Sequence, residues 1–212
     1  MKLYYHPLSG NSRCVLLAAH QLGVSLELLV VDLPKREQHE ASHLQRNPTG
    51  RVPVLDDDGF LLWESRAIMQ YLAEKTPGQA LFPTETRARA DVNRWLFWCA
   101  AHMAPANTVL VLENFVKART GRGPADPAEV ARGEALVAQS ASVLDAQLAG
   151  KTWVAQDRLT LADLSLAASF ALAGPARLPI AGYPNLLAWL GRVQELEAWK
   201  RTAPQLPPGG PA

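Results

Sequence analysis

The sequence predicts a fold with an α/β half followed by an all-α half. Three observations carry this prediction. Residues 1–75 alternate short apolar runs with helical spacing, residues 76–86 contain two prolines and a glycine, and the pattern beyond them is helical throughout. We therefore expect one domain over 1–77, a second over 86–203, and a disordered Pro- and Gly-rich tail over 204–212.

The first half is predicted to begin with a strand, a helix and a second strand. Lys2–Tyr5 is a short apolar strand, and the helical spacing of Ser12–Leu22 ends at Gly23, a typical C-terminal cap. Leu26–Val31 is a continuous apolar run, as a buried parallel strand requires. The polar segment Pro34–Arg46 predicts a short irregular helix.

A hairpin and one more helix complete this half. Val52–Leu55 and Leu61–Trp63 are predicted strands, and the Asp- and Gly-containing segment Asp56–Gly59 between them is a strong hairpin signal. The last helix is expected from about Ser65 to about Glu74.

The second half shows helical periodicity. Apolar residues recur every three or four positions along 87–107 and again along 130–148, which predicts two long amphipathic helices. Thr160–Ala173 is apolar on nearly all faces, so we expect a central buried helix there. Asn185–Gln194 predicts a further helix.

Composition narrows the class of protein. A hydrophobic share of 48% and a charged share of 19% are typical of a globular chain. The formal net charge of +1 gives no reason to expect a nucleic-acid or membrane partner. Charges or prolines interrupt every apolar run, so no membrane-spanning helix is expected. Cys14 and Cys99 form neither a CxxC pair nor a metal-binding spacing, and the N-terminus has no signal-peptide pattern, so we expect a cytoplasmic protein.

Three motifs carry a family resemblance. Residues 47–55 read NPTGRVPVL and resemble the NPxGxVPxL segment of glutathione transferases. Residues 64–68, ESRAI, are similar to the ES-x-AI motif that follows it in that family. Residues 159–163, LTLAD, look like the capping box of the buried helix in the family's C-terminal domain.

This resemblance implies a cytosolic glutathione S-transferase with a thioredoxin-like N-terminal domain and an all-helical C-terminal domain. Glutathione would be the co-substrate, small hydrophobic electrophiles would be conjugated to its thiolate in detoxification, and no metal would take part. The family is usually homodimeric, and Arg66, Arg87, Arg89 and Arg94 are expected where such an interface would fall.

The resemblance also implies a set of glutathione-binding residues. A cis peptide between Val52 and Pro53 would turn the main chain of Val52 toward the cysteinyl unit, in the manner of an added strand. Glu64 would offset the ligand's ammonium, and Ser65, at a helix N-terminus, would bind the γ-glutamyl carboxylate. The alternative for Ser65 is that it only caps its helix.

Two further sets complete the binding hypothesis. Gln38 and His39 both lie where the family places a side chain for the glycyl carboxylate, and the sequence does not choose between them. Arg51 is a further carboxylate candidate, with a solvated surface arginine as its alternative.

The loop at 6–13 should activate the thiol. It contains no tyrosine, so a serine-type or related bacterial class fits better than a tyrosine-type class. By analogy with the family, Ser9 occupies the hydroxyl position and Asn11 the position of an asparagine near the sulfur in some bacterial relatives. Ser12 is the competing hydroxyl, with helix capping as its alternative, and Cys14 is expected to be a packed thiol.

Other residues suggest weaker hypotheses. Residues 39–43, HEASH, match the HExxH zinc-protease pattern, but the segment is short and polar, and Glu64, a conceivable third ligand, already belongs to the ES-x-AI motif. Trp98 and His102 are predicted to line an electrophile pocket between the two halves.

Conjugation has two competitors on the same fold. One is glutathione-dependent reduction of disulfides or peroxides, and the other is a non-catalytic binding module.

Overall fold

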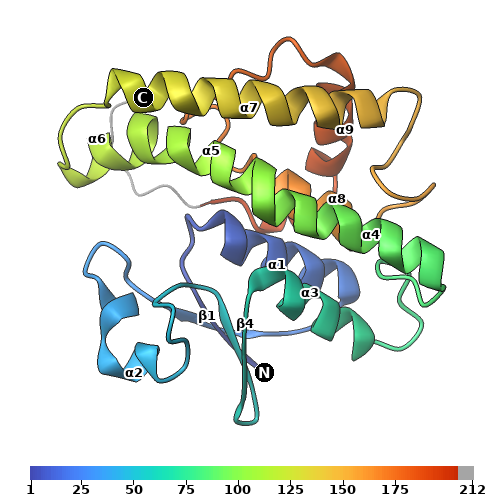
Figure 1. The fold of residues 1–212 in the computed structure, drawn as a ribbon. Helices are drawn as coiled ribbons and strands as arrows, with labels where there is room; N and C mark the ends of the chain where they lie inside the picture. Colours follow the sequence, from blue (N-terminus) through green and yellow to red (C-terminus); the bar gives the residue numbers. More distant parts are fainter. Residues whose placement is uncertain (205–212) are drawn as a thin grey trace.

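A computed structural model describes residues 1–204 of the chain. The predicted disordered tail at 204–212 therefore lies outside the described residues, except for Pro204. Figure 1 shows an N-terminal half built on a small sheet and a second half of packed helices, with α1 and α3 between the sheet and the helical half.

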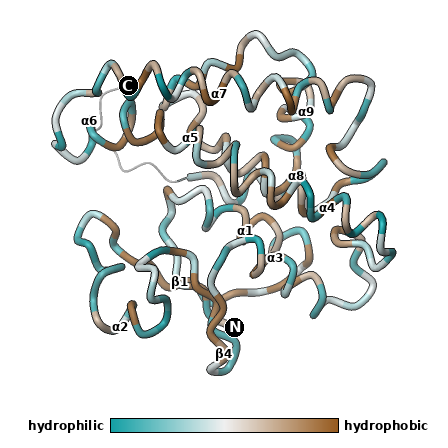
Figure 2. The backbone as a smooth tube through the Cα atoms, in the orientation of Figure 1, coloured by the Kyte–Doolittle hydropathy of each residue, from teal (hydrophilic) through white to brown (hydrophobic). Residues whose placement is uncertain are grey.

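The N-terminal sheet has four strands in the order β2-β1-β3-β4. The strands are β1 (Lys2–Tyr5), β2 (Glu27–Val30), β3 (Val54–Asp57) and β4 (Phe60–Trp63). β1 runs parallel to β2 and antiparallel to β3, and β3 pairs antiparallel with β4. The predicted β-α-β, irregular connection and β-β-α order is confirmed. Figure 2 shows hydrophobic stretches along this sheet.

The prediction of a buried strand at Leu26–Val31 is wrong in one respect. The strand is parallel as predicted, but it lies at the sheet edge, where Leu28 is 45% and Val30 59% exposed. A continuous apolar run does not distinguish an edge strand from a central one, because edge position depends on pairings elsewhere in the chain.

The predicted hairpin is confirmed, with a two-residue turn. Asp57 pairs with Phe60, and Asp58 and Gly59 between them have φ angles of 51° and 92°. Positive φ at both central positions matches the right-handed twist of the flanking strands, which explains the Asp-Gly sequence.

Helices cover the sheet and form the second half. In the first half these are α1 (Gly10–Leu22), the 3₁₀ turn η1 (Glu37–His39), α2 (Ala41–Leu44) and α3 (Ser65–Glu74). In the second half they are α4 (Thr86–Trp98), η2 (Cys99–Met103), α5 (Ala104–Leu110), η3 (Val111–Val116), α6 (Lys117–Thr120), α7 (Pro127–Leu148), α8 (Leu161–Ala168), α9 (Pro184–Gln194) and α10 (Glu197–Arg201).

The first long helix exceeds its predicted end. From Thr86 to Thr120 the chain is continuously helical, because the π-helical segments η2 and η3 join α4, α5 and α6. This run of 35 residues is long and apolar enough to cross a membrane, which corrects the prediction that no stretch qualifies. One side of it is packed in the protein core, where Val92, Leu96 and Met103 are at most 1% exposed, whereas Phe97 is 69% exposed.

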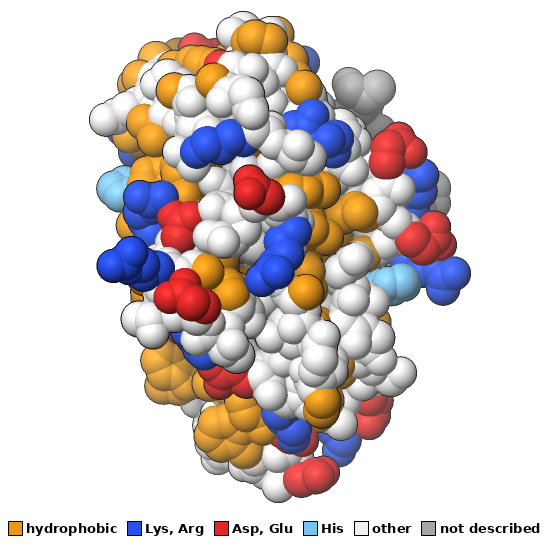
Figure 3. Space-filling view, turned by 90° about the vertical axis from the view of Figure 1, so that its right-hand side faces the viewer, with side chains coloured by type: hydrophobic (Ala, Val, Ile, Leu, Met, Phe, Trp, Pro, Cys, Tyr) orange, Lys and Arg blue, Asp and Glu red, His pale blue; other side chains and the backbone are white. Residues whose placement is uncertain are grey.

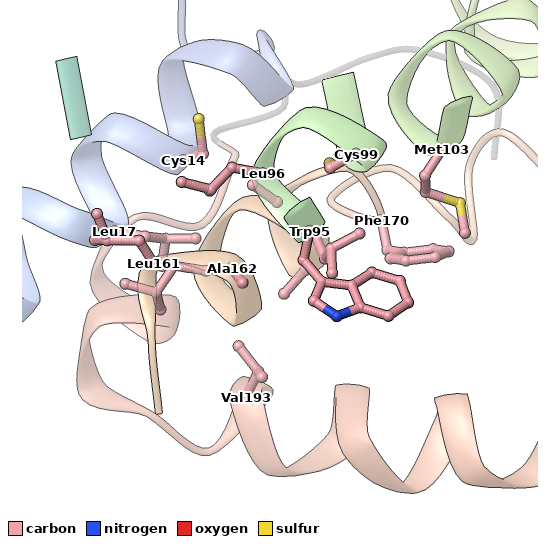
Figure 4. Close-up of a cluster of buried hydrophobic side chains, with 14 of the residues drawn as sticks. Cys14, Leu17, Trp95, Leu96, Cys99, Met103, Leu161, Ala162, Phe170 and Val193 are labelled. Atoms are coloured by element: carbon pink, nitrogen blue, oxygen red, sulfur yellow. The ribbon is translucent and has the colours of Figure 1, made fainter. Parts of the chain in front are cut away.

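The buried central helix is confirmed, in a shorter form. All eight residues of α8 are buried, and the chain beyond Ala168 continues in turns instead of helix. Figure 4 shows α8 residues Leu161 and Ala162 packed among Cys14 and Leu17 of α1 and Leu96 of α4. One apolar cluster thus joins both halves of the protein.

Charges are mixed on the surface. On the face drawn in Figure 3, basic and acidic side chains are interspersed over both halves, and no single-sign patch forms there. This agrees with the net charge of +1.

Candidate functional site

The N-terminus of α1 is capped by Ser9. Its backbone is extended (φ −81°, ψ 117°), and its Oγ accepts a hydrogen bond of 3.2 Å from the backbone N–H of Ser12. Ser12 therefore lies inside the helix, three residues after the cap, and is fully buried, and its Oγ accepts a hydrogen bond of 3.4 Å from the backbone N–H of His6. The helix starts earlier than predicted, and the alternative that Ser12 is its cap is wrong. Ser9 is partly exposed and keeps its hydroxyl proton available for a ligand.

The loop before Ser9 is held by His6. The backbone N–H of Ser9 donates to the His6 carbonyl at 3.0 Å, and that of Leu8 donates to His6 Nδ1 at 3.2 Å. Burial lowers the pKa of His6 below its ordinary value of 6.5, while the charge of Asp32 opposes this shift. The neutral ring is the form that accepts from Leu8.

Cys14 is a packed thiol, as expected. It is fully buried, its Sγ donates to the Asn11 carbonyl at 3.1 Å, and burial raises its pKa. A thiol in this state is a poor nucleophile.

The N-terminus of α3 lies beside that of α1. Glu64 occupies the cap position with a positive φ of 71° and makes no side-chain capping bond. Ser65 is the first helical residue and is 2% exposed, so the alternative that it merely caps the helix is wrong. A non-glycine residue at positive φ is strained, and such residues concentrate at functional sites.

The Val52-Pro53 peptide bond is cis, as the resemblance implied. The preceding carbonyl, that of Arg51, is fixed by two contacts of 2.9 Å, from His43 Nε2 and Asn47 Nδ2. Both side chains are buried. Neither residue was predicted to hold this loop: Asn47 was part of the NPTGRVPVL motif and His43 part of the HExxH pattern, and their burial beside the turn follows only from the fold.

Gln38 and His39 are brought close to this loop. A Cβ added at Gly50, which has a φ of 62°, would lie 2.9 Å from His39 Nδ1 and 3.3 Å from the Gln38 carbonyl oxygen. The Gln38 Oε1 atom is buried without a hydrogen-bond partner among the described residues. The backbone of Gly50 therefore approaches η1 more closely than a residue with a side chain could without displacing His39.

The HExxH pattern does not form a histidine pair on one helix. His39 ends η1, Glu40 is extended (ψ 149°), and His43 belongs to the separate α2 with its Nε2 engaged by Arg51. Within residues 1–204, no group of three or more His, Cys, Asp or Glu side chains could hold a metal ion.

Arg66 is a partly buried residue of this site. Its guanidinium bridges α1, α3, η2 and α8 through hydrogen bonds to Asn11, Ser65, Cys99 and Ser165. All four of these partners belong to the same chain, and the expectation that Arg66 lies at a dimer interface stays a prediction. Sequence reasoning missed this role because an arginine next to a helix start reads as a surface residue until the partners from other elements are known.

Trp98 and His102 lie elsewhere. They line a groove in the helical half between the long helix and α7, with Trp95, Leu136, Val143 and Gln147 among the other lining residues. All lining residues of this groove come from the helical half, so the prediction that these two side chains form an interdomain electrophile pocket is wrong. They sit on α4 and η2, but Cys99, the neighbour of Trp98, is the residue that faces Arg66.

Comparison with known proteins decides the family. The chain matches the family model of the glutathione S-transferase N-terminal domain over residues 1–74 and that of the C-terminal domain over 96–197. The chain belongs to the glutathione S-transferase family.

Individual members of the family agree with this. Glutathione S-transferase F10 of Arabidopsis thaliana is 35% identical over 205 residues, which cover 94% of each chain. Glutathione transferase F7 of Populus trichocarpa has a TM-score of 0.86 at 28% identity, covering 95% of this chain and 97% of its own. A delta-class glutathione transferase of Nilaparvata lugens has a TM-score of 0.81 at 32% identity, covering 95% and 94%. The predicted thioredoxin-like and all-helical fold is confirmed.

Proposed function

We propose that this protein conjugates the glutathione thiolate to small hydrophobic electrophiles and that Ser9 supplies the activating hydroxyl. The observation that carries the proposal is the state of Ser9. Its oxygen already accepts the Ser12 N–H, so its proton is directed to another acceptor, and the side chain is partly exposed at the positive end of α1.

The required stabilisation is modest. A thiol with an ordinary pKa of about 8.5 is mostly protonated at neutral pH, and lowering that pKa by about two units needs roughly 2.7 kcal/mol of selective thiolate stabilisation. A hydrogen bond to a charged group contributes about 1.5–3 kcal/mol, and a helix N-terminus adds about 0.3–1 kcal/mol. One hydroxyl at a helix start is therefore of the right size for the task.

The rest of glutathione is assigned along the neighbouring elements. Ser65 and Glu64 at the start of α3 would bind the γ-glutamyl unit, and the main chain of Val52, before cis Pro53, would pair with the cysteinyl unit. The glycyl carboxylate would reach η1 and the neighbouring loop.

Gln38, His39 and Arg51 supply the candidates for that carboxylate. Gln38 is the favoured candidate, because its Oε1 atom is buried without a partner among the described residues and its N–H₂ group can donate to a carboxylate.

Assembly and location follow the family. We propose a soluble, cytoplasmic homodimer, with the exposed apolar side chains of Phe97 (69% exposed) and Val143 (46%) as parts of the contact between subunits. Analytical ultracentrifugation of the wild type and of Phe97→Ser tests it, since loss of the dimer in the variant is expected. A wild type that sediments as a monomer at micromolar concentration would contradict it.

The deciding experiment is a steady-state assay with glutathione on a chlorinated nitroaromatic and, in parallel, on a small disulfide and an organic peroxide. For Ser9→Ala we expect conjugation to fall roughly tenfold to a hundredfold at neutral pH, as loss of a charge-assisted hydrogen bond implies. Ser12→Ala is the control variant, and we expect it to lower the free energy of unfolding and to leave kcat for conjugation unchanged.

Other outcomes would select the competitors. Disulfide or peroxide reduction that exceeds conjugation would favour the reductase or peroxidase hypothesis. Glutathione binding without turnover on any of the three substrates would favour the binding module. Conjugation indifferent to Ser9→Ala would remove Ser9 from its assigned role.

A further inference from the structure

We propose that Arg66 is a positioning residue that turns the Asn11 amide so that its N–H₂ group faces the glutathione sulfur. The inference rests on the proposed function, since it assigns a second donor to the same thiolate. It concerns the polar network between α1 and α3 and not the hydroxyl of Ser9.

The guanidinium of Arg66 is held in one orientation by four hydrogen bonds. Nη1 donates to Asn11 Oδ1 at 2.6 Å and to Ser65 Oγ at 3.0 Å. Nη2 donates to Cys99 Sγ at 3.2 Å, and Nε donates to Ser165 Oγ at 3.0 Å. Because a guanidinium is planar and rigid, anchors on four separate helical segments fix the direction of every N–H.

This orientation determines which end of the Asn11 amide points where. Arg66 carries donors and no acceptor, so only the amide oxygen of Asn11 can meet Nη1. The nitrogen and oxygen of an asparagine amide are assigned from such partners, and here a charged donor settles the assignment. The Asn11 N–H₂ group is thus turned away from Arg66, and no acceptor for it is found among residues 1–204. Asn11 is exposed and lies two residues from Ser9, so its free donors are available to an anion at the start of α1.

The charge of Arg66 points to the same conclusion. Its four partners are neutral groups, and within residues 1–204 no carboxylate lies within ion-pair distance of it. The exposed arginines Arg94, Arg132 and Arg201 do pair with carboxylates. The carboxylate of Glu64, beyond ion-pair distance, is the one that acts on the Arg66 charge among the described residues. A partly buried cation whose hydrogen-bond partners are all neutral polarises the Asn11 amide, so the N–H₂ end becomes a better donor to an anion.

Arg66 also joins the two ends of the proposed glutathione site. The same nitrogen contacts Ser65, assigned to the γ-glutamyl unit, and Asn11, assigned to the sulfur, while Cys99 and Ser165 tie it to the helical half. The helical half thereby helps to set the geometry at the thiol.

The test is a double-mutant cycle with Arg66→Lys and Asn11→Ala, read out by two quantities. One is the pH midpoint of kcat/KM for conjugation, and the other is the ultraviolet titration of the thiol of bound glutathione. Each single variant should raise the midpoint by roughly one unit, about tenfold in thiolate at neutral pH, as loss of one hydrogen bond to a charged group implies. The double variant should shift no further than Asn11→Ala alone, because Arg66 acts through that amide.

Arg13→Lys is the matched control. Arg13 is also a buried arginine of this region, but its Nη2 donates to the Trp199 carbonyl at 3.1 Å and its guanidinium lies 3.7 Å from the Trp199 ring, on α10. Its replacement should lower Tm and leave the thiol midpoint unchanged.

Three results would overturn the inference. The first is an unchanged pH midpoint in Asn11→Ala; this residue is exposed, so its variant can be measured even if the Arg66 variants fail to fold. The second is an Arg66→Lys shift of the midpoint that is as large in the Asn11→Ala background as in the wild type. The third is a rise in KM without any shift of the midpoint. Each of these leaves conjugation by the wild type intact, which separates them from failure of the proposed function. A wild type that does not bind glutathione overturns both.

Discussion

The start of α8 and the starts of α1 and α3 carry similar polar side chains, but the hydrogen bonds of these side chains are satisfied in different ways. At α8, Asp163 is fully buried and accepts four hydrogen bonds, from the backbone of Val154 and Thr160, the Thr160 hydroxyl and the Trp189 indole, all at 2.9–3.0 Å. At α1, which Arg66 links to α3, Ser9 is partly exposed and Asn11 exposed, and both keep donors without a partner in the described structure. A polar network that is closed within the protein holds the fold, and one that is left open marks where a ligand completes it.

The two regions also differ in how they carry charge. Burial raises the pKa of Asp163, and four hydrogen bonds that favour the carboxylate oppose this shift. Every one of those donors is part of the protein, so the closed network has no role for a ligand. Arg66 is the opposite case, because its hydrogen-bond partners are all neutral and Glu64 acts on its charge only from beyond ion-pair distance.

The largest expected effect breaks the closed network. Asp163→Ala would leave the Val154 N–H, the Thr160 N–H and the Trp189 indole buried without an acceptor, so we expect a loss of about 3–5 kcal/mol in the free energy of unfolding. Urea unfolding followed by tryptophan fluorescence measures it.

Asp145→Ala is the matched control for that loss. Asp145 is only partly buried and accepts from the Leu186 backbone and the Asn185 side chain at the start of α9, so its loss should be near 1 kcal/mol. Equal losses for the two variants would contradict the claim that complete burial of the Asp163 network sets the size of its loss.

The next effect tests the open region through Gly50. An alanine there would be strained at a φ of 62° and would press against His39, so η1 and its Gln38 and His39 must shift. We expect the Kd of glutathione to rise roughly tenfold, with kcat less affected.

Gly150→Ala separates strain from contact. Gly150 has a φ of 69° and nothing within 4 Å of an added Cβ, so the same substitution should reduce stability without weakening glutathione binding. Calorimetric titration with glutathione compares the two variants, and an equal Kd for both would mean that the η1 contact does not matter for binding.

The smallest effect concerns pH and His6. Because the folded state lowers the pKa of His6, the unfolded chain binds a proton first as pH falls below about 6.5. The stabilisation is therefore complete above that pH and is lost as pH falls through the folded-state pKa. His6→Asn keeps an acceptor for Leu8 without titrating, so Tm should decline less between pH 7 and pH 5, by the order of one or two degrees. His20→Asn, exposed on α1, is the control, and an equal change there would contradict a specific role for His6.

Much of the fold could be predicted because its signals are local. The hairpin was visible in its Asp-Gly turn, α3 in residues 65–74, and α8 in the Thr160–Asp163 capping box. The edge position of β2 and the π-helical continuation of the long helix were not visible, since both depend on packing between distant segments.

The candidate site divides in the same way. Motif residues such as Ser65 and Pro53 stand where the sequence placed them, while His43, Asn47 and Arg66 acquire their partners only in three dimensions. Trp98 and His102 were assigned by their helix alone. The adjacent residue Cys99 contacts Arg66 of α3, while Trp98 and His102 line the groove beside α7.

The close contact of Gly10, the residue after Ser9, limits which N- and C-terminal halves of related proteins can be joined in a chimera. A Cβ at this position would lie 3.2 Å from the Ala168 carbonyl at the end of α8, so the loop that carries Ser9 rests directly on the backbone of the helical half. A chimera that joins the N-terminal half of one relative to the C-terminal half of another must therefore reproduce this backbone-to-backbone spacing. The two halves are exchangeable as modules only in pairs whose turn after α8 has the same path.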